Sequence, residues 1–362
     1  MKKIYYITAV FATLFLVGCG DGIDLPGVNV ETDLNKIPLP DNNVNLEQVE
    51  LKPSTEPMLH EGLHTEEDFQ RIRDKKAAGE EPWVSAYQLL VESQFSQKTA
   101  DTYPTEWIKR GISGDENYMN AARGATIVYQ QALRWKIEQD DEYAAKAVEN
   151  LNKWVQTCVG VTGNTNLSLA AGLYGYEFAI AGELLRDYGG WDRADFAAFQ
   201  NWLLKVFYPA NDDFLKRHHD TNALHYWANW CLCNIAAKMA IGIVTDRRDI
   251  YNEGIAHLQT GDTNGRLRRA IYHDYAPDYN FAQWQESGRD QGHTLMCVGL
   301  MGIICQLAWS QGDDFFAYDD NLFLRACEYA ACCNYTNETV PYTTYISVSY
   351  THLRAHETRG NL

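Results

Sequence analysis

The sequence predicts an all-α fold, specifically an (α/α) toroid or barrel built from helical hairpins. From about residue 58 onward, apolar residues recur at helical spacing between breaks at Gly, Pro and Asn-Asp clusters. The alternation of period two that indicates strands is essentially absent from this text. Long helices joined by short turns are typical of stacked hairpins, and no period of 34 or 40 residues indicates a short-repeat solenoid.

Local chemistry predicts where individual helices begin. Thr65 precedes three acidic residues, which is a typical helix start. Pro82 lies where the first turn of the next helix would be, and Trp83, Tyr87 and Leu90 follow at helical spacing. Further helices are expected at residues 117–138, 141–158, 166–187, 192–207, 221–243, 247–259, 289–311 and 320–334.

Composition excludes several classes of protein. The chain has 362 residues, of which 46% are hydrophobic and 22% charged, so it is neither a polytopic membrane protein nor a disordered chain. Its net charge of −17 argues against a nucleic-acid partner, which requires a positive surface. Its 10 Trp and 22 Tyr are common both in helical cores and in sugar-binding clefts.

The first 57 residues are predicted to lie outside the folded domain. Two lysines and an apolar run to Val17 have the pattern of a secretory signal, and the run ends in Gly18-Cys19, which resembles a bacterial lipobox. We expect residues 1–18 to be a lipoprotein signal peptide, Cys19 to be lipidated, and residues 19–57 to be a flexible tether. The protein would then be exported and held at the bacterial outer membrane by its lipid anchor alone. A plain signal peptide cut nearby is the alternative.

The last residues of the chain are predicted not to belong to the natural protein. Residues 348–358 match a reading frame through a transposase adapter used in sequencing libraries. Residues 348–362 are therefore predicted to be non-biological, and the domain at residues 58–347 to be incomplete. The zinc-like spacing of His352 and His356 is discarded for the same reason.

Eight cysteines besides Cys19 are predicted to be unpaired thiols in the core, since most lie in apolar helical text. A disulfide framework is the alternative for an exported chain, but it suits smaller, loop-rich domains. Cys231 and Cys233 lack the spacing of a redox or zinc pair.

Polar residues that break the helical pattern gather in two stretches. In the first, residues 216–230, the residues Asn222, His225, Tyr226 and Asn229 would share one face of the helix expected at 221–243. Such a face is costly to bury unpaired, so it is a candidate site. The alternative is a hydrogen-bonded polar seam between helices.

The second stretch, residues 279–293, leads into the helix expected at 289–311. Glu286, Arg289 and His293 fall at i, i+3 and i+7 on one face, and Arg289 has the planar fork that binds a carboxylate through two bonds. The alternative is a capping and salt-bridge cluster in which Arg289 pairs with Glu286 or Asp290.

A basic run, Arg266, Arg268 and Arg269, lies between the two stretches and favours either an acidic substrate or a solvated helix face. No phosphate-binding Gly loop, dinucleotide fingerprint or Gly-x-Ser-x-Gly turn is found, so no cofactor is expected. No metal is expected either. Histidines that are adjacent on one turn diverge, which disfavours a site made from His218, His219 and Asp220.

Residues 63–69, 132–136, 225–230 and 285–293 resemble the alginate lyase superfamily of polysaccharide lyases, and most closely polysaccharide lyase family 38, a neighbour of family 5. The last two blocks are the specific ones, and the resemblance covers roughly residues 58–345. It implies an (α/α) toroid that cleaves uronic-acid polymers by β-elimination. The implied substrates are acidic polysaccharides: polymannuronate, mixed alginate or glucuronan.

The chemistry of β-elimination then suggests roles. Removing the C5 proton of a uronate requires neutralisation of its carboxylate, for which Asn222 and Arg289 are candidates. His225 is the candidate base, and Tyr279 the first candidate for the acid that protonates the O4 leaving group. In relatives of this kind a single tyrosine can serve as both. Together with His293, an orienting group, these are the predicted catalytic residues.

Other residues of the two stretches are predicted to bind sugar, with Trp227 and Trp284 as stacking platforms. Tyr272 and Tyr275 are the alternatives for the acid. One departure from the family pattern is Cys231, which stands where an acidic residue is expected. The predicted substrate-binding residues are Tyr226, Trp227, Asn229, Trp284, Gln285 and Glu286.

Two rival functions remain open at this point. A glycoside hydrolase on the same toroid would use two carboxylates, such as Asp220 and Glu286, on either side of the bond. A lipid-anchored glycan-binding protein would need aromatic platforms but no catalytic histidine.

Overall fold

The computed structural model describes residues 54–335 and 340–344. The predicted signal peptide, the lipidated Cys19, most of the tether and the predicted non-biological tail all lie outside the described residues.

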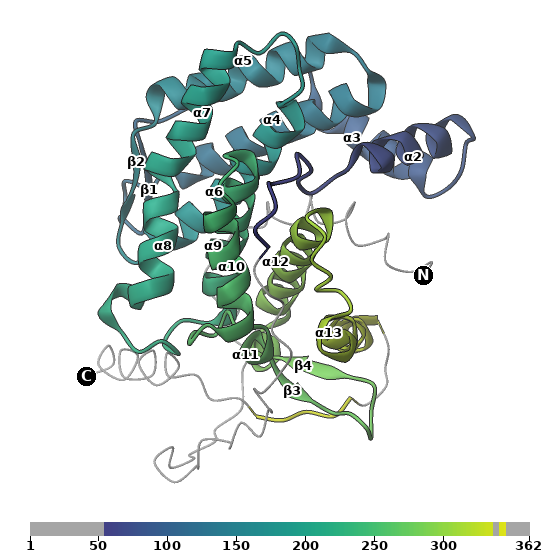
Figure 1. Cartoon of the computed structure of the whole chain (residues 1–362), viewed down its shortest axis with the longest axis vertical. Coiled ribbons are helices and arrows are strands. Elements are labelled where there is room, and N and C mark those ends of the chain that lie inside the picture. Colours follow the sequence, from purple (N-terminus) through teal and green to yellow (C-terminus); the bar gives the residue numbers. More distant parts are fainter. Residues whose placement is uncertain (1–53, 336–339, 345–362) are drawn as a thin grey trace.

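The domain is an all-α toroid of helical hairpins, which confirms the predicted fold class (Figure 1). Its four long inner helices are α4 (Tyr118–Glu138), α6 (Leu167–Leu185), α9 (Ala228–Val244) and α12 (Gln291–Ser310). Outer helices return the chain after each of them: α5 (Asp141–Thr157), α7 (Arg193–Val206) with α8 (Tyr208–Arg217), α10 (Arg248–Thr260) and α13 (Tyr318–Tyr335). Two further helices, α2 (Glu66–Ala77) and α3 (Trp83–Glu92), precede them.

The inner helices run parallel, so that their N-termini lie at the same end of the domain. Near the start of α6 and α9, the Asn234 side chain donates a hydrogen bond to the Ser168 carbonyl (3.2 Å). Just beyond the end of α6, Arg186 donates to the Val244 carbonyl at the end of α9 (2.9 Å). This arrangement brings the connections that precede α4, α6, α9 and α12 to one face.

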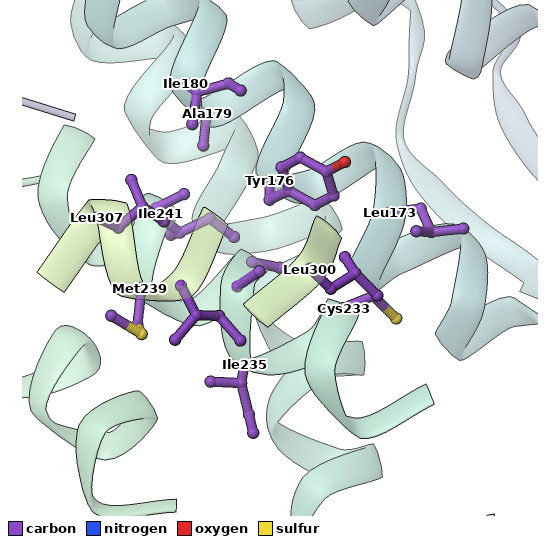
Figure 2. Packing of buried hydrophobic residues seen from close by; sticks show 14 of the residues in the cluster. Leu173, Tyr176, Ala179, Ile180, Cys233, Ile235, Met239, Ile241, Leu300 and Leu307 are labelled. Atoms are coloured by element: carbon purple, nitrogen blue, oxygen red, sulfur yellow. The ribbon is translucent and has the colours of Figure 1, made fainter. Parts of the chain in front are cut away.

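The core lies where α6, α9 and α12 meet. Both α6 and α9 are buried almost all round, as expected for helices without a polar face. Gly172 permits their close approach, because a Cβ at this position would lie 3.0 Å from the backbone of Cys233. Figure 2 shows the packing of side chains from these three helices: Leu173, Tyr176, Ala179, Ile180, Cys233, Ile235, Met239, Ile241, Leu300 and Leu307.

None of the eight cysteines within the described residues is in a disulfide, as predicted. Cys333 is exposed and Cys327 half-buried, while the other six are buried. Burial raises the pKa of the Cys231 thiol to about 12, so this group is an uncharged core residue.

Most helix bounds agree with the sequence prediction, but three features differ. The helix expected at 221–243 begins only at Ala228, and α8 was not predicted. Phe207 separates α7 from α8, with Pro209 in the first turn of α8, where a missing N–H costs nothing. Four short strands were also missed. Strand β1 (Trp107–Arg110) pairs in parallel with β2 (Gly160–Gly163), and β3 (Ile271–Asp274) pairs antiparallel with β4 (Ala282–Trp284).

The chain before α2 crosses the end of the domain opposite to the inner-helix N-termini. Arg248 on α10 donates to the carbonyls of Glu56 and Pro57, and Gln311, just after α12, exchanges hydrogen bonds with Leu59. Residues 54–57, which the sequence assigns to the end of the tether, thus contact the domain. Helix α2 then begins as predicted, with a capping box between Thr65 and Asp68.

Within the described residues, α12 alone is long and apolar enough to cross a membrane, judged by length and composition. It is packed against α9 and α13 inside the domain, and a core helix passes the same test.

Candidate active site

The predicted site stretches meet at the N-terminal end of the inner helices. The connection from α8 to α9 includes a short 3-10 turn, η3 (His218–Asp220). The connection from α10 to α12 contains α11 (Leu267–Ala270), β3, β4 and a second turn, η4 (Gln285–Gly288). Both connections lie in the lower part of Figure 1. Because helix N-termini carry partial positive charge, this end of the toroid favours an anionic ligand.

The two stretches are joined through the first turn of α9. Trp227 supplies no side-chain cap there. Instead, the Gln285 side chain accepts a hydrogen bond from the Ala228 N–H (2.8 Å), and the Glu286 carboxylate accepts one from the Asn229 N–H (2.9 Å). Two residues of η4 thus satisfy N–H groups that every helix leaves unpaired at its start.

Glu286 is fully buried and holds Arg289. Its carboxylate accepts from Arg289 Nη1 (3.1 Å) and from Cys297 Sγ (3.3 Å). Burial raises the pKa of Glu286, although the Arg289 charge and the Asn229 N–H oppose this shift. The salt-bridge alternative from the sequence is therefore present, and Glu286 is a structural anchor rather than a residue open to sugar.

Arg289 nevertheless remains available to a ligand. Its side chain is 30% exposed, and its guanidinium lies 5.4 Å from the centre of the Trp227 ring. Its Nε also lies 3.7 Å from Asp290 Oδ2, so the guanidinium is held at Nη1, at Nε and against an aromatic ring, and Nη2 keeps a fixed orientation toward an external carboxylate. Glu286, Arg289 and His293 do not share a helix face, because α12 begins only at Gln291.

His293 belongs to the cap of α12. Asp290 accepts from the His293 N–H (2.8 Å) and from its Nδ1 (2.6 Å). Burial raises the pKa of Asp290, but the His293 hydrogen bond and the His293 and Arg289 charges outweigh it, so the net shift is downward. His293 is thereby oriented by an ionised carboxylate.

The segment before α9 is not helical, which corrects the predicted shared face. Asn222 forms a local turn, in which its side chain accepts from the Leu224 N–H (2.8 Å). His225 is half-buried and lies edge-on to the Tyr226 ring at 4.9 Å. Of the four residues expected on that face, Asn229 alone lies within α9, where it is buried.

Three successive residues, His218, His219 and Asp220, have positive φ values of 49°, 52° and 59°. This backbone is unfavourable for residues other than glycine. The two histidine rings both lie against Phe214 and Tyr226 but have different hydrogen-bond partners. His218 stacks on Phe214 beside Cys231, and burial lowers its pKa to about 4. His219 instead bonds Ser168 at the start of α6 (2.9 Å).

The three candidate tyrosines differ in their surroundings. Tyr272 is buried, and its hydroxyl donates to the Thr343 carbonyl. Tyr275 donates to the Gln283 side chain (2.6 Å), and burial raises its pKa. Tyr279 lies in the connection between β3 and β4 and is 53% exposed.

Trp284 is a core residue, which corrects its predicted role as a sugar platform. It is fully buried, packs edge-on against Phe323, and donates its indole N–H to the Ala326 carbonyl (3.0 Å). Gln285 is likewise buried, with its amide oxygen engaged by α9. Trp227 and Tyr226 are each 8% exposed, so little of either ring reaches the surface.

The basic run is partly neutralised. Arg268 pairs with Asp319, with Asp274 at 4.0 Å, and Arg269 donates to the Asp262 carbonyl. Arg268 is therefore part of an ion-pair network that links α11 to α13.

Sequence reasoning missed Arg110, the last residue of β1, and Tyr118, the first residue of α4, which lie at this end of the domain. They lie in separate segments without the local spacing that identified the other stretches. The available signal was an arginine next to an expected break, Gly111, followed by an aromatic residue at a helix start.

Comparison with known proteins now identifies the class. A family model described as alginate lyase matches residues 73–338, which is most of the chain. The chain belongs to the alginate lyase family. It is a polysaccharide lyase that acts on alginate-like polymers. No curated protein matches it.

Solved structures share the fold at low sequence identity. A variant of alginate lyase A1-III complexed with a tetrasaccharide is 14% identical, with a TM-score of 0.59 over 78% of this chain and 82% of that one. An alginate lyase from Bacteroides ovatus is 14% identical, with a TM-score of 0.52 over 74% and 82%. Alginate lyase A1-III from Sphingomonas species A1 is 13% identical, with a TM-score of 0.53 over 76% and 80%. These likenesses confirm the toroid.

Proposed function

We propose that this lyase, as a member of polysaccharide lyase family 38, cleaves polymannuronate, mixed alginate or glucuronan by β-elimination at the face where α9 and α12 begin. The observation that carries the proposal is Arg289, which is held by buried Glu286 and lies against Trp227. A fixed guanidinium beside two helix N-termini is suited to neutralising a uronate carboxylate.

The proposed reaction proceeds through an enolate. Arg289 and Asn222 hold the carboxylate, which lowers the cost of charge that develops when the C5 proton leaves. His225 takes that proton through its imidazole. The electron pair then forms the C4–C5 double bond as the C4–O4 bond breaks, and the acid gives its proton to O4. The products are a new non-reducing end that is a 4,5-unsaturated uronate and a shortened chain with a free hydroxyl.

A tyrosine of the β3–β4 segment is the proposed acid. Tyr279 is the first candidate, because its ring is largely exposed while the hydroxyls of Tyr272 and Tyr275 donate to protein acceptors. Single Tyr-to-Phe replacements at the three positions separate them. Replacement of the tyrosine that serves as the acid should abolish turnover, whereas the other two variants should keep it.

The hydrolase alternative is disfavoured by the geometry of its carboxylates. Glu286 is buried and engaged by the Asn229 N–H, while exposed Asp220 pairs with Arg217 (3.0 Å). Neither arrangement provides an acid and a base on opposite sides of a sugar bond.

The test follows the ultraviolet absorbance of the unsaturated product on polymannuronate, polyguluronate, glucuronan and hyaluronan. We expect a rise on at least one of the first three polymers. His225→Ala should abolish it with unchanged circular dichroism, while the matched variant His60→Ala, at the opposite end of the domain, should retain it. A flat trace from folded protein on every polymer, or full activity in His225→Ala, would contradict the proposal.

We further propose that the protein is exported and lipid-anchored through Cys19 at the bacterial outer membrane. The support is the lysine-flanked apolar run that ends in Gly18-Cys19. Labelling of expressing cells with a radioactive fatty acid should mark the wild-type protein but not Cys19→Ser. Equal labelling of both proteins would contradict the anchor.

A further inference from the structure

Arg110 has one guanidinium nitrogen without an acceptor in the part of the chain that the structure describes. It ends β1, its side chain is half-buried, and its Nη1 is buried without a hydrogen-bond acceptor among the residues that the structure describes. The acidic residues of the following turn are engaged elsewhere. Asp115 pairs with Lys109 (2.7 Å), and Glu116 accepts from the Gly111 N–H (2.5 Å). A buried donor without an acceptor is costly and therefore rare in a folded protein.

Aromatic rings hold this guanidinium in place. Its central carbon lies 4.7 Å from the centre of the Tyr118 ring at the start of α4. Tyr118 in turn stacks on buried Tyr174 of α6, with ring centres 6.5 Å apart and planes inclined by 12°. Stacking fixes the plane of the guanidinium while leaving its edge for hydrogen bonds, which is the geometry that binds a carboxylate.

The backbone around Arg110 connects it to the candidate active site. Arg110 is paired in register with Gly163 at the end of β2. Five residues further on, Ser168 at the start of α6 bonds His219 (2.9 Å), whose ring lies 5.7 Å from that of Tyr226, next to the proposed base His225. The Arg110–Gly163 pair and the Ser168–His219 bond therefore link the end of β1 to the segment before α9 at the same end of the domain. Burial raises the pKa of Cys233 on α9 and the Arg110 charge opposes this shift, which also places the guanidinium near α9.

We propose that Arg110, stacked on Tyr118, is a binding subsite for the carboxylate of a second uronate unit of the polymer, beside the unit that reacts at Arg289. This inference rests on the proposed function, because it assumes a polyuronate substrate. The subsite binds a sugar that does not react, so it contributes to KM and to preference for acidic polymers rather than to the chemical step.

The test compares Arg110→Gln and Arg110→Lys with a control, Arg193→Gln, which replaces an exposed arginine at the start of α7. On the polymer that the wild type cleaves, we expect Arg110→Gln to raise KM about tenfold or more while kcat stays within about twofold. The KM of Arg110→Lys should lie between those of the wild type and Arg110→Gln, because lysine keeps the charge but not the planar fork. Arg193→Gln should match the wild type.

A binding measurement separates this inference from the proposed function. Calorimetric titration with a saturated tetrauronate should show the same loss of affinity in Arg110→Gln placed in the His225→Ala background. If the wild type cleaves no polyuronate but binds the tetrauronate through Arg110, the proposed function fails and the subsite stands. Unchanged KM and affinity in Arg110→Gln, with a wild-type circular dichroism spectrum, would overturn the subsite. So would an equal loss in Arg193→Gln.

Discussion

The carboxylate of Glu286 accepts a hydrogen bond from the backbone N–H of Asn229, 57 positions earlier in the chain, at 2.9 Å. This bond joins η4 to the start of α9 and so fixes the two site stretches relative to each other. The same carboxylate holds Arg289, so one buried side chain both caps a helix and orients the proposed carboxylate-binding group.

Replacing Glu286 should therefore destabilise the domain. Glu286→Ala leaves the Asn229 N–H without its acceptor and removes the partner of Arg289 Nη1, while Arg289 keeps Asp290, so we expect a loss of about 1–3 kcal/mol in the free energy of unfolding. Glu286→Gln keeps an acceptor and should cost less. Urea unfolding followed by circular dichroism measures both, with Glu328→Gln on the exposed face of α13 as the control. A Glu286→Ala protein as stable as that control would show that the cap contributes nothing.

Arg289→Lys tests the planar fork directly. Lysine keeps the charge but presents a point donor, so the enolate should lose most of its stabilisation. We expect kcat to fall by about 100-fold, with thermal unfolding close to that of the wild type. Steady-state rates on the cleaved polymer give the comparison. If kcat is unchanged and only KM rises, Arg289 binds the substrate without acting in the transition state.

Glu177 on α6 should make stability decrease as pH rises. Burial raises its pKa to about 8, against a smaller opposing effect of its hydrogen bond to Tyr176, and its Oε2 has no partner among the described residues. The folded state therefore keeps a proton that the unfolded state releases near pH 4.5. The stabilisation is fully present below about pH 4.5 and is lost as pH rises through about 8.

Glu177→Gln removes this titration. Between pH 6.5 and 8 the wild-type free energy of unfolding should include a downward slope of up to about 1.4 kcal/mol per pH unit from this one proton. The variant should lack that contribution, as measured by urea unfolding at a series of pH values. Identical slopes in the two proteins would mean that Glu177 is already ionised in the folded state.

Gly163 should be required for the pairing of β1 with β2. Its φ is +146°, and a Cβ there would overlap the Arg110 carbonyl oxygen. Gly163→Ala should therefore lower the free energy of unfolding by about 2 kcal/mol or more. It should also raise KM, because the clash would displace Arg110. Gly189→Ala, where a Cβ meets nothing within 4 Å, is the matched control and should be close to neutral. Equal melting temperatures for the two variants would argue against the strained position.

Much of the helical framework was predictable from local sequence. The capping box at Thr65 and Asp68 needs residues only three apart, and its geometry is as expected. The bounds of α4 and α5 also follow the apolar period closely. These features depend on contacts within one or two helical turns, which adjacent residues largely determine.

The site was only partly predictable. The two stretches were located by their polar residues, but the face expected to unite Asn222, His225 and Asn229 does not exist, because α9 begins at Ala228. The start of α9 depends on hydrogen bonds to Gln285 and Glu286, which lie in η4, distant from α9 in the sequence. Likewise, the neighbouring sequence does not distinguish Trp284, which is buried against α13, from an aromatic residue that is accessible to sugar.

The sequence by itself determined the all-α class, the family and the two stretches proposed to carry the chemistry, because periodicity and short blocks are local properties. The tertiary structure alone decided which polar groups are already engaged and which remain for a ligand. The Glu286 carboxylate is hydrogen-bonded at the start of α9, whereas Arg110 has a buried N–H with no acceptor among the described residues. Burial and pairing arise between segments distant in the chain, so they become visible only when the inner helices are placed side by side.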